Sequence, residues 1–366
     1  ATGGTVTASV TANASEFDTL TTNNTTDAIT VYVSDAISTS QIATLTTKTN
    51  IPISYNGGLI DTMSNLASSG SVTSAVTTAV DDDSNINITV SDTELTESHV
   101  ININALASTT TGVLTATING RYSELSGLTT STSDLIAITV NERVTVEEGA
   151  TISGLTSSSA TVNYMIGIND TISNLVTSDS ASSNFGIVLT RDSDVDVIVS
   201  DTVTASQGEV VANATTEGTV TYLSGVVDSI SGLTSSGSIT DDFVAITNND
   251  SDIAVTVSGQ LSDSSVSDLN AIATATDGVV TATISGNSAE LAGLTTLSTD
   301  LINITVNDVI TAAEGASIAG ATSSSSTVIY SVGLNDTIAG LVSGSSITAN
   351  LTTVVNLDSD INIIVS

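Results

Sequence analysis

The chain of 366 residues contains no cysteine, no tryptophan and a single proline, Pro52, and aromatic residues make up only 2% of it. Without cysteine there is neither a disulfide framework nor a thiolate nucleophile. With so few aromatic side chains the core must be aliphatic, built from layers of Val, Ile, Leu and Ala. No apolar run approaches the roughly 18–20 residues of a transmembrane helix, so we expect no membrane span. Stability must instead come from repetitive packing, cation binding or the length of a strand ladder.

Positive charge is equally scarce, because four Lys and Arg residues face 39 Asp and Glu residues, for a formal net charge of −35. Nucleic acid and anionic membrane surfaces repel such a polyanion, so neither is expected as a partner. Divalent cations would be attracted. Charged residues are nevertheless only 12% of the chain and its mean hydropathy is positive, whereas disordered polyanions combine high charge with low hydrophobicity. The composition therefore predicts a folded acidic protein.

The chain does contain an internal repeat with a period of 166 residues. The run VLTATINGRYSELSGL begins at residue 113 and returns at residue 279 as VVTATISGNSAELAGL. The 166-residue period divides the chain into a partial repeat at 1–34, a first copy at 35–200 and a second copy at 201–366. The partial repeat includes a candidate assembly strand. Repetition at fixed phase is typical of stacked architectures. It favours an elongated repeat protein over a protein with one active site.

Each copy contains three sub-repeats of about 55 residues, each marked by a strand of the form I-x-V-x-[DEN]. These strands are predicted at 29–35, 86–92, 136–142, 195–201, 253–259, 302–308 and 361–366. Short helical stretches with Ser or Thr as N-caps are expected between them. A second strand type carries a tyrosine, whose repetition indicates a packing role. Further extended pieces are predicted at 184–190 and 242–247.

Strands that alternate with one- or two-turn helices predict a mostly β repeat protein, with β-solenoid-like coils stacked about 4.8 Å apart. The alternative is a string of tandem β-sandwich domains. The helical runs at 267–275 and 288–294 favour the solenoid, because sandwiches seldom need helices.

Asp-rich turns before several strands are the candidate metal sites. Their oxygen ligands at alternate positions suit Ca²⁺, although Asp and Ser also bond their own backbone in ordinary turns. Structural Ca²⁺ is therefore a hypothesis, and no cofactor is otherwise required. The candidate ligands are Asp83, Asp192, Asp194, Asp250, Asp252, Asp358 and Asp360.

Stacked repeats would also bring together the acidic residues that end the first strand type, Asp35, Asp92, Asp201 and Asp308. Like charges at that range repel one another. We therefore expect cations, protonation or a lateral offset to relieve the repulsion.

Catalysis has little support in the sequence. The single histidine, His99, is not repeated in the second copy, and the acidic pair Glu147–Glu148 becomes Ala313–Glu314 there. No phosphate-binding loop or nucleophile motif is present. The chain is predicted not to be an enzyme.

The ITVND strand (304–308), the T-[AV]-x-E-G-A helix, the VTATISG strand (280–286) and the E-L-x-G-L turn together resemble the Ser/Thr/Asp-rich tandem repeats of giant bacterial surface proteins. Such repeats occur in marine and cyanobacterial cell-surface and filament-forming proteins. The resemblance covers most of the chain and rests on composition as much as on motif. It implies a secreted protein at the cell surface with a structural or adhesive role, and it carries over no catalytic residue.

The function predicted from these observations is that of a structural subunit or segment of an extracellular filament, sheath or surface layer. The strand at 4–12 and the strand at 361–366 would each expose an unpaired edge, so copies of the chain would assemble end to end as a homopolymer. Dense Ser and Thr also make glycan modification a hypothesis. The alternatives are the repeat stalk of a bacterial adhesin and, ranked last, an ice- or mineral-binding face of Thr ladders. The pattern at both termini favours a fragment or a processed subunit cut between repeats.

Overall fold

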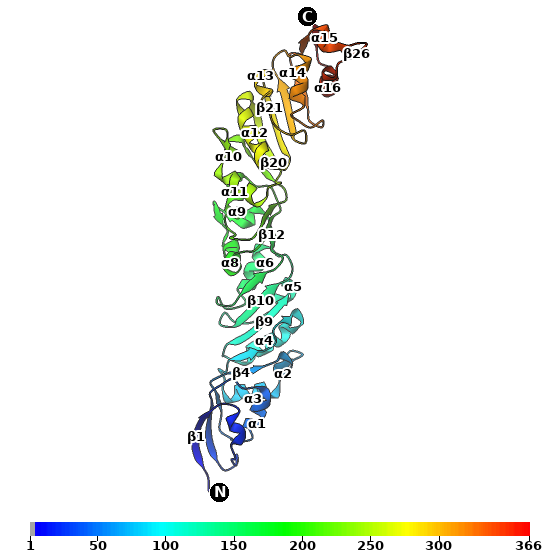
Figure 1. The fold of residues 1–366 in the computed structure, drawn as a ribbon. Coiled ribbons are helices and arrows are strands. Elements are labelled where there is room, and N and C mark those ends of the chain that lie inside the picture. The colour runs from blue at the N-terminus through cyan, green and yellow to red at the C-terminus, as the bar shows by residue number, and fades with distance from the viewer. Residues whose placement is uncertain (1–3) are drawn as a thin grey trace. The chain divides into compact units, whose positions relative to one another are not determined.

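The computed structural model describes residues 4–366, and it shows an α/β fold in which short parallel strands alternate with α-helices (Figure 1). Helices account for 33% and strands for 28% of the chain. The prediction of a mostly β protein with β-solenoid-like coils is therefore wrong. The alternative of tandem β-sandwich domains is wrong too, because sandwiches pair their strands antiparallel, whereas the long ladders here are parallel.

Two segments that we predicted as extended explain much of this error. Residues 184–190 lie in helix α8 (Ser183–Arg191), and residues 242–247 lie in helix α11 (Asp241–Asn249). Each helix buries two residues three positions apart, Phe185 with Val188 and Phe243 with Ile246, which is helical spacing. Packing of this apolar face outweighs the preference of the β-branched residues for strands.

The chain forms two compact units, and the first comprises residues 4–168 and 183–195 among the residues described. Its main sheet has the strand order β11-β10-β9-β7-β4, with β8 also paired to β9, beside a smaller sheet β1-β2-β3 and a hairpin β5-β6. Its strands are β1 (Thr7–Ala12), β2 (Ala28–Val33), β3 (Ser54–Tyr55), β4 (Leu59–Asp61), β5 (Ala67–Ser68), β6 (Ser71–Val72), β7 (Ile88–Val90), β8 (Leu95–Thr96), β9 (Leu114–Gly120), β10 (Leu135–Val140) and β11 (Val162–Tyr164). Its helices are α1 (Thr39–Leu45), α2 (Met63–Leu66), α3 (Ser74–Asp82), α4 (Val100–Thr109), α5 (Tyr122–Leu125), α6 (Val146–Ser153) and α8, with 3-10 turns η1 (Glu16–Thr19) and η2 (Glu97–His99).

The second unit comprises residues 169–182 and 196–366. It contains the sheets β12-β15-β16, β17-β20-β21-β22-β23 and β24-β27, and the hairpins β13-β14, β18-β19 and β25-β26. Its strands are β12 (Ile168–Asp170), β13 (Val176–Thr177), β14 (Ser180–Ala181), β15 (Val197–Val199), β16 (Val220–Tyr222), β17 (Val226–Ser229), β18 (Thr234–Ser235), β19 (Ser238–Ile239), β20 (Val255–Ser262), β21 (Val280–Gly286), β22 (Leu301–Val306), β23 (Val328–Tyr330), β24 (Leu334–Asp336), β25 (Val342–Ser343), β26 (Ser346–Ile347) and β27 (Ile363–Val365). Its helices are α7 (Ile172–Leu175), α9 (Ala205–Ala212), α10 (Ile230–Leu233), α11, α12 (Val266–Ala275), α13 (Ser288–Leu291), α14 (Ala312–Ala319), α15 (Ile338–Leu341) and α16 (Ala349–Leu357), with the 3-10 turn η3 (Asp263–Ser265).

Equivalent strands of the two sequence copies pair in the same register. Thr115 of β9 lies opposite Leu135 of β10, and 166 residues later Thr281 of β21 lies opposite Leu301 of β22. Both β9 and β21 alternate fully buried with half-buried residues, because successive side chains point to opposite faces of the sheet. The repeat in the sequence is therefore a repeat of strand pairing and of burial.

Four helices begin with the N-caps that their sequences predict. Ser or Thr caps the helix, and a Gln or Glu three residues later bonds back to the cap, which forms a capping box at the starts of α1, α6, α9 and α14. In α6 the box consists of Thr145 and Glu148, whose carboxylate accepts bonds from both the amide and the hydroxyl of Thr145. Across residues 4–366 no helix is both long and apolar enough to cross a membrane.

A glycine inside α6, α9 and α14 lets each helix approach its neighbours closely. A Cβ built on Gly208 would lie 2.4 Å from Cδ1 and 2.8 Å from Cγ1 of Ile246, which belongs to α11. The hydroxyl of Tyr222 donates to the carbonyl of Gly208 at 2.7 Å, and Tyr164 and Tyr330 make the same bond to Gly149 and Gly315. The tyrosines of the second strand type, Tyr55, Tyr164, Tyr222 and Tyr330, are all buried, which confirms their packing role.

We predict that Gly208→Ala destabilises the protein although alanine is the better helix former. Overpacking against Ile246, which is fully buried, should outweigh the gain in helix propensity, for a net loss of about 1–3 kcal/mol. The matched control is Gly186→Ala in α8, where nothing lies within 4 Å of an added Cβ. That variant should gain up to about 1 kcal/mol. Denaturant unfolding of both variants measures the difference, and two changes of the same sign would contradict the close-packing explanation.

Candidate functional site

The Asp residues predicted as metal ligands lie where helices end and new strands begin. Asp83, Asp250 and Asp358 are the C-caps of α3, α11 and α16, and Asp192 directly follows α8. Each carboxylate accepts the backbone amide of a tyrosine in a neighbouring strand, at distances of 2.9 Å for Tyr55, 2.6 Å for Tyr164, 2.8 Å for Tyr222 and 2.8 Å for Tyr330. These carboxylates therefore hold a strand amide that has no strand partner at that point.

Two of these residues also interact with the second acidic residue of their turn. Asp250 shares a side-chain hydrogen bond with Asp252, and Asp358 shares one with Asp360. Burial raises the pKa of Asp250 and of Asp358, the amide bond opposes that shift, and the neighbouring carboxylate raises each pKa further. Each pair is thus a site where one proton can be shared between two carboxyl groups.

The same pairs are the groups that could bind a cation. Hard cations such as Ca²⁺ take six or more oxygen ligands, and each turn supplies only two carboxylates, one of which already accepts an amide. In the part of the chain from residue 4 onward, no cluster of three or more acidic or histidine side chains has metal-binding geometry. Calcium at Asp192–Asp194, Asp250–Asp252 and Asp358–Asp360 therefore stays a prediction.

A second set of carboxylates, which come two residues after the end of a strand, accepts the amides at the starts of short helices or turns. Asp35, Asp92, Glu142, Asp201 and Asp308 accept the backbone amides of Ala14, Met63, Tyr122, Ile172 and Ser288, at distances between 2.5 and 2.7 Å. The acceptor and the donor lie 20 to 29 residues apart in the chain, so each bond joins successive strand-and-helix steps. The free amides of a helix N-terminus favour negative charge. Each of these carboxylates therefore has an amide donor near its negative charge.

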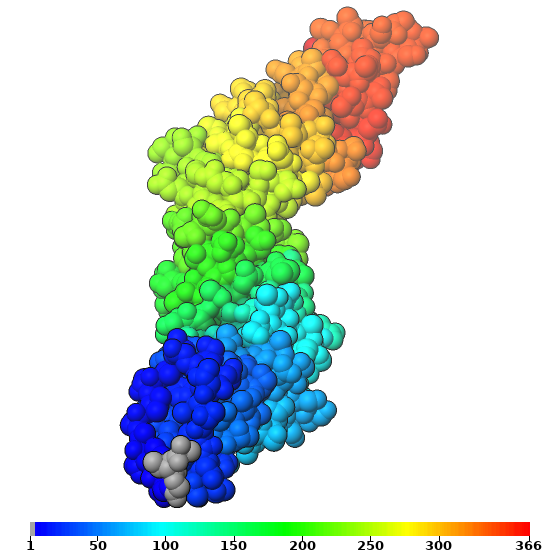
Figure 2. Space-filling view, turned by 60° about the horizontal axis from the view of Figure 1, so that its bottom comes forward, coloured from blue at the N-terminus to red at the C-terminus, as the bar shows by residue number. Residues whose placement is uncertain are grey.

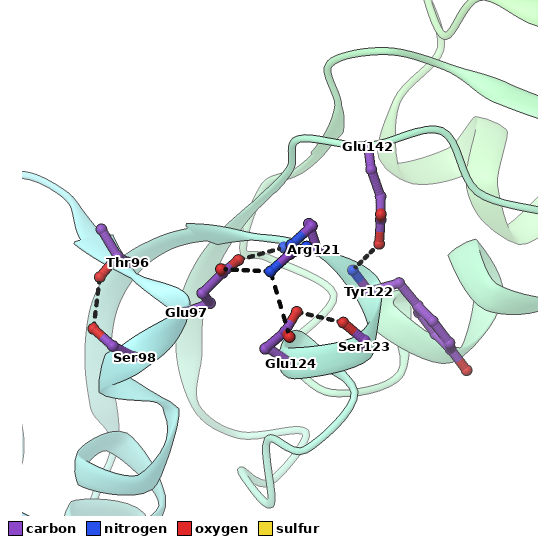
Figure 3. Close-up of polar contacts among 8 residues, drawn as sticks. All are labelled: Thr96, Glu97, Ser98, Arg121, Tyr122, Ser123, Glu124 and Glu142. Atoms are coloured by element: carbon purple, nitrogen blue, oxygen red, sulfur yellow. Dashed lines mark hydrogen bonds and ion pairs between the residues drawn. The ribbon is translucent and has the colours of Figure 1, made fainter.

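Figure 3 shows this arrangement around Arg121. Glu142 accepts the Tyr122 amide, while Glu97 accepts both the amide and the guanidinium of Arg121, and Glu124 lies within 3.7 Å of that guanidinium. The Arg121 amide is the main reason why the pKa of Glu97 is lowered. In the second copy Asn287 replaces Arg121, and its amide still bonds to Asp263. The amide bond is the repeated feature, and the ion pair is an addition.

The residues considered for catalysis have structural partners. Glu148 belongs to the capping box of α6, and His99 bonds to Thr96 at the end of η2. Glu147 and Glu148 both lie in the first turn of α6, where acidic side chains complement the helix dipole.

An apolar surface near the C-terminus is the feature that the sequence did not reveal. Ile338, Val342, Ile347, Ile363 and Val365 are all more than 40% exposed, and we call this set of residues the C-terminal face; they belong to the end of the chain that is red in Figure 2. The equivalents of three of these residues in the first copy are buried. Ile172 is 7% exposed where Ile338 is 67%, Val197 is 1% where Ile363 is 43%, and Val199 is 0% where Val365 is 58%. Alignment of the two copies identifies the positions, and the structure shows how much their exposure differs.

Within the described residues the first strand and the last strand each have one partner. Strand β1 pairs with β2 alone, and β27 pairs with β24 alone. By contrast β15, the equivalent of β27 in the first copy, has a partner on each side, β12 and β16.

We predict that the strand-terminal carboxylates stabilise the fold through their amide bonds. Asp308→Ala would leave the Ser288 amide and hydroxyl without their acceptor and should cost about 1–3 kcal/mol. Asp308→Asn keeps one acceptor oxygen and should lose less. The control, Asp277→Ala, removes an exposed carboxylate and should change stability by less than about 0.5 kcal/mol. Urea unfolding compares the three variants, and equal losses for Asp308 and Asp277 would contradict the prediction.

The carboxyl pairs predict a pH dependence with a definite sign. Because the pKa of Asp250 and of Asp358 is raised in the folded state, the native protein binds protons there more tightly than the unfolded chain does. Their contribution to stability is complete below the ordinary value of 3.8 and is lost as the pH rises through the raised value.

Acidification from neutral pH into the carboxyl range should therefore raise the melting temperature of the wild type more than that of the double variant Asp250→Asn, Asp358→Asn. Circular dichroism melts across that range measure the two curves. The exposed control Asp277→Asn should follow the wild type, and parallel curves for wild type and double variant would reject a shared proton.

Comparison with known proteins identifies no relative: neither a family model, nor a curated protein, nor a solved structure matches this chain.

Proposed function

We propose that the chain is a structural component of an extracellular filament, sheath or surface layer that assembles through copies of itself, without catalysis. The observation that carries the proposal is the difference between the two copies at the C-terminal face. Side chains that the first copy buries under its next strand and helix are exposed in the second copy at Ile338, Ile363 and Val365. Exposed apolar patches commonly mark sites of interaction, and we propose that a second molecule of this chain contacts this one.

Burial of the exposed aliphatic side chains would contribute a substantial free energy to association. Full burial of one branched aliphatic side chain contributes about 1.5–3 kcal/mol. Three such side chains supply several kcal/mol, and the pairing of an open strand edge adds to this. The acidic surface opposes association at low ionic strength, because each whole chain carries a formal net charge of −35, and salt screens the repulsion between chains.

The composition supports an extracellular setting for this role. A chain without cysteine needs no redox machinery to fold and is not altered by oxidation of thiols outside the cell. The exposed Ser and Thr side chains provide positions for glycan, which belongs to the same proposal. Self-association is the part that this chain can test directly.

We predict that the purified chain associates as its concentration and the ionic strength rise, and that Ile363→Asp with Val365→Asp prevents this. Each Asp would bury a charge in the contact, so we expect the apparent dissociation constant to rise at least about tenfold per substitution. Sedimentation velocity measures the size distribution, and negative-stain electron microscopy shows the form of the assemblies.

The matched control is Leu223→Asp, which places the same charge on a residue that is 63% exposed in the turn after β16. It should assemble like the wild type, and circular dichroism should show that all variants are folded. A wild type that stays monomeric at every concentration and salt would reject the proposed function.

A further inference from the structure

We infer that the second copy carries a binding site for a guanidinium cation between the C-terminal end of α14 and Leu357 of α16 (both helices are labelled in Figure 1). The inference goes beyond the proposed function, because it concerns a ligand and not the association of the chain with itself. It follows from the comparison of this place with its equivalent in the first copy, where Arg191 stands 166 residues before Leu357.

In the first copy the guanidinium of Arg191 bonds to four backbone carbonyls at and after the end of α6. Nη2 donates to the carbonyls of Ser153 at 2.8 Å and of Thr156 at 3.3 Å. Nη1 donates to the carbonyls of Ser157 at 2.8 Å and of Ala160 at 3.2 Å. The carbonyls that end a helix carry partial negative charge and favour a cation. These four acceptors together form a receptor for one guanidinium.

The loop that supplies the acceptors is held in the same way in the second copy. The amide of Ser323 donates to the carbonyl of Asp300 at 2.8 Å, and the equivalent bond from Ser157 to Asp134 is also 2.8 Å long. The carbonyl of Ser323 accepts the amide three residues later at 2.9 Å, and that of Ser157 accepts its equivalent at 3.0 Å. The second copy therefore keeps the backbone that arranges the carbonyls.

The donor for these carbonyls is missing from the second copy, because Leu357 replaces Arg191. Among the described residues no donor bonds to the carbonyls of Ala319, Thr322 or Ser326, which are the equivalents of three of the carbonyls that the arginine binds. All three residues are buried. Because buried carbonyls are normally paired, these acceptors call for a donor that the chain does not supply.

A cavity of about 370 Å³ gives a ligand access to this place. Its lining includes Ala319, Thr322 and Leu357. The equivalent cavity of the first copy is lined by Arg191 and its neighbours in α8, and not by the residues that correspond to Ala319 and Thr322. Where the arginine is replaced by leucine, the cavity thus extends to the residues whose carbonyls are unpaired.

The acceptors and the charge of the chain select the kind of ligand. Carbonyl oxygens accept hydrogen bonds and donate none, so the site does not suit an anion. The formal net charge of −35 raises the local concentration of cations. A guanidinium presents its N–H donors in one rigid plane and is more weakly hydrated than an ammonium, so it is the better match. A small guanidinium compound and the arginine side chain of another protein share this chemistry.

NMR titration of the isotope-labelled, full-length wild type tests the site through the amide shifts of residues 322–326. The probe is methylguanidinium chloride at millimolar concentration, and methylammonium chloride at the same ionic strength is the control for charge alone. We expect methylguanidinium to bind at this loop at least about tenfold more tightly than methylammonium. Equal binding of the two cations, or no response of the loop, would overturn the inference.

The variant Leu357→Arg supplies the missing side chain and should occupy the site from within. We expect it to weaken methylguanidinium binding at 322–326 at least about tenfold and to raise the melting temperature. The matched control Leu357→Met keeps an apolar side chain of similar volume and should bind like the wild type. Undiminished binding by Leu357→Arg would place the ligand elsewhere and reject the site.

The reciprocal variant Arg191→Leu should create a second site in the first copy. Methylguanidinium should then shift the amides of residues 156–160, which do not respond in the wild type, and should recover part of the lost melting temperature. A folded Arg191→Leu protein whose loop ignores the ligand would contradict the receptor role of the carbonyls. If this variant does not fold, Leu357→Arg decides the matter.

Two capped tripeptides distinguish the sources of the guanidinium. Gly-Arg-Gly presents the group on a backbone, as a partner protein would, and Gly-Lys-Gly is its control. Binding of methylguanidinium and of Gly-Arg-Gly supports a site that accepts the arginine of another protein. Binding of methylguanidinium alone supports a site for a small molecule. Binding of Gly-Lys-Gly as tight as that of Gly-Arg-Gly would overturn the assignment to guanidinium.

Discussion

The structure depends on carboxylates that accept backbone amides from a neighbouring step of the repeat. Parallel strands of two to eight residues leave amides unpaired where each strand ends, and every short helix begins with amides that have no partner within the helix. Asp308 and its equivalents bind the amides at helix starts, and Asp358 and its equivalents bind the tyrosine amides. A charged acceptor makes a stronger bond than a neutral one. This requirement explains why a chain with so few cations retains so many acidic residues.

The second constraint is close packing in a core that has almost no aromatic side chains. The glycine of α6, α9 and α14 brings each helix against its neighbour, and the tyrosine hydroxyl binds the carbonyl of that same glycine. In the first of the repeats Ile42 replaces this glycine in α1, and Tyr55 bonds to Asp82 instead. The helix position and the tyrosine partner therefore change together, as expected for two parts of one contact.

Because the chain repeats, each strand can be compared with an equivalent strand that has different neighbours. A strand inside the repeat is covered on both sides, and a strand that lacks one neighbour keeps the side chains that the neighbour would bury. Val6 and Ile363 are such residues, because their equivalents Leu114 and Val197 are buried.

The sequence alone determined the repeat, its spacing, the positions of the main strands, the helix caps and the packing role of the tyrosines. These features depend on local chemistry: alternation for strands, Ser or Thr for caps, and the return of the same residue at the same phase. Tertiary structure alone decided that 184–190 and 242–247 are helical, that the sheets are parallel within an α/β fold, and that Asp358 binds an amide. Short runs of Val, Ile and Phe suit a strand or a buried helix equally well, and only the partner packed against Phe185 or Phe243 selects between them. A carboxylate at a turn likewise has no assigned partner until the chain brings an amide to it from more than 20 residues away, as Tyr330 is brought to Asp358.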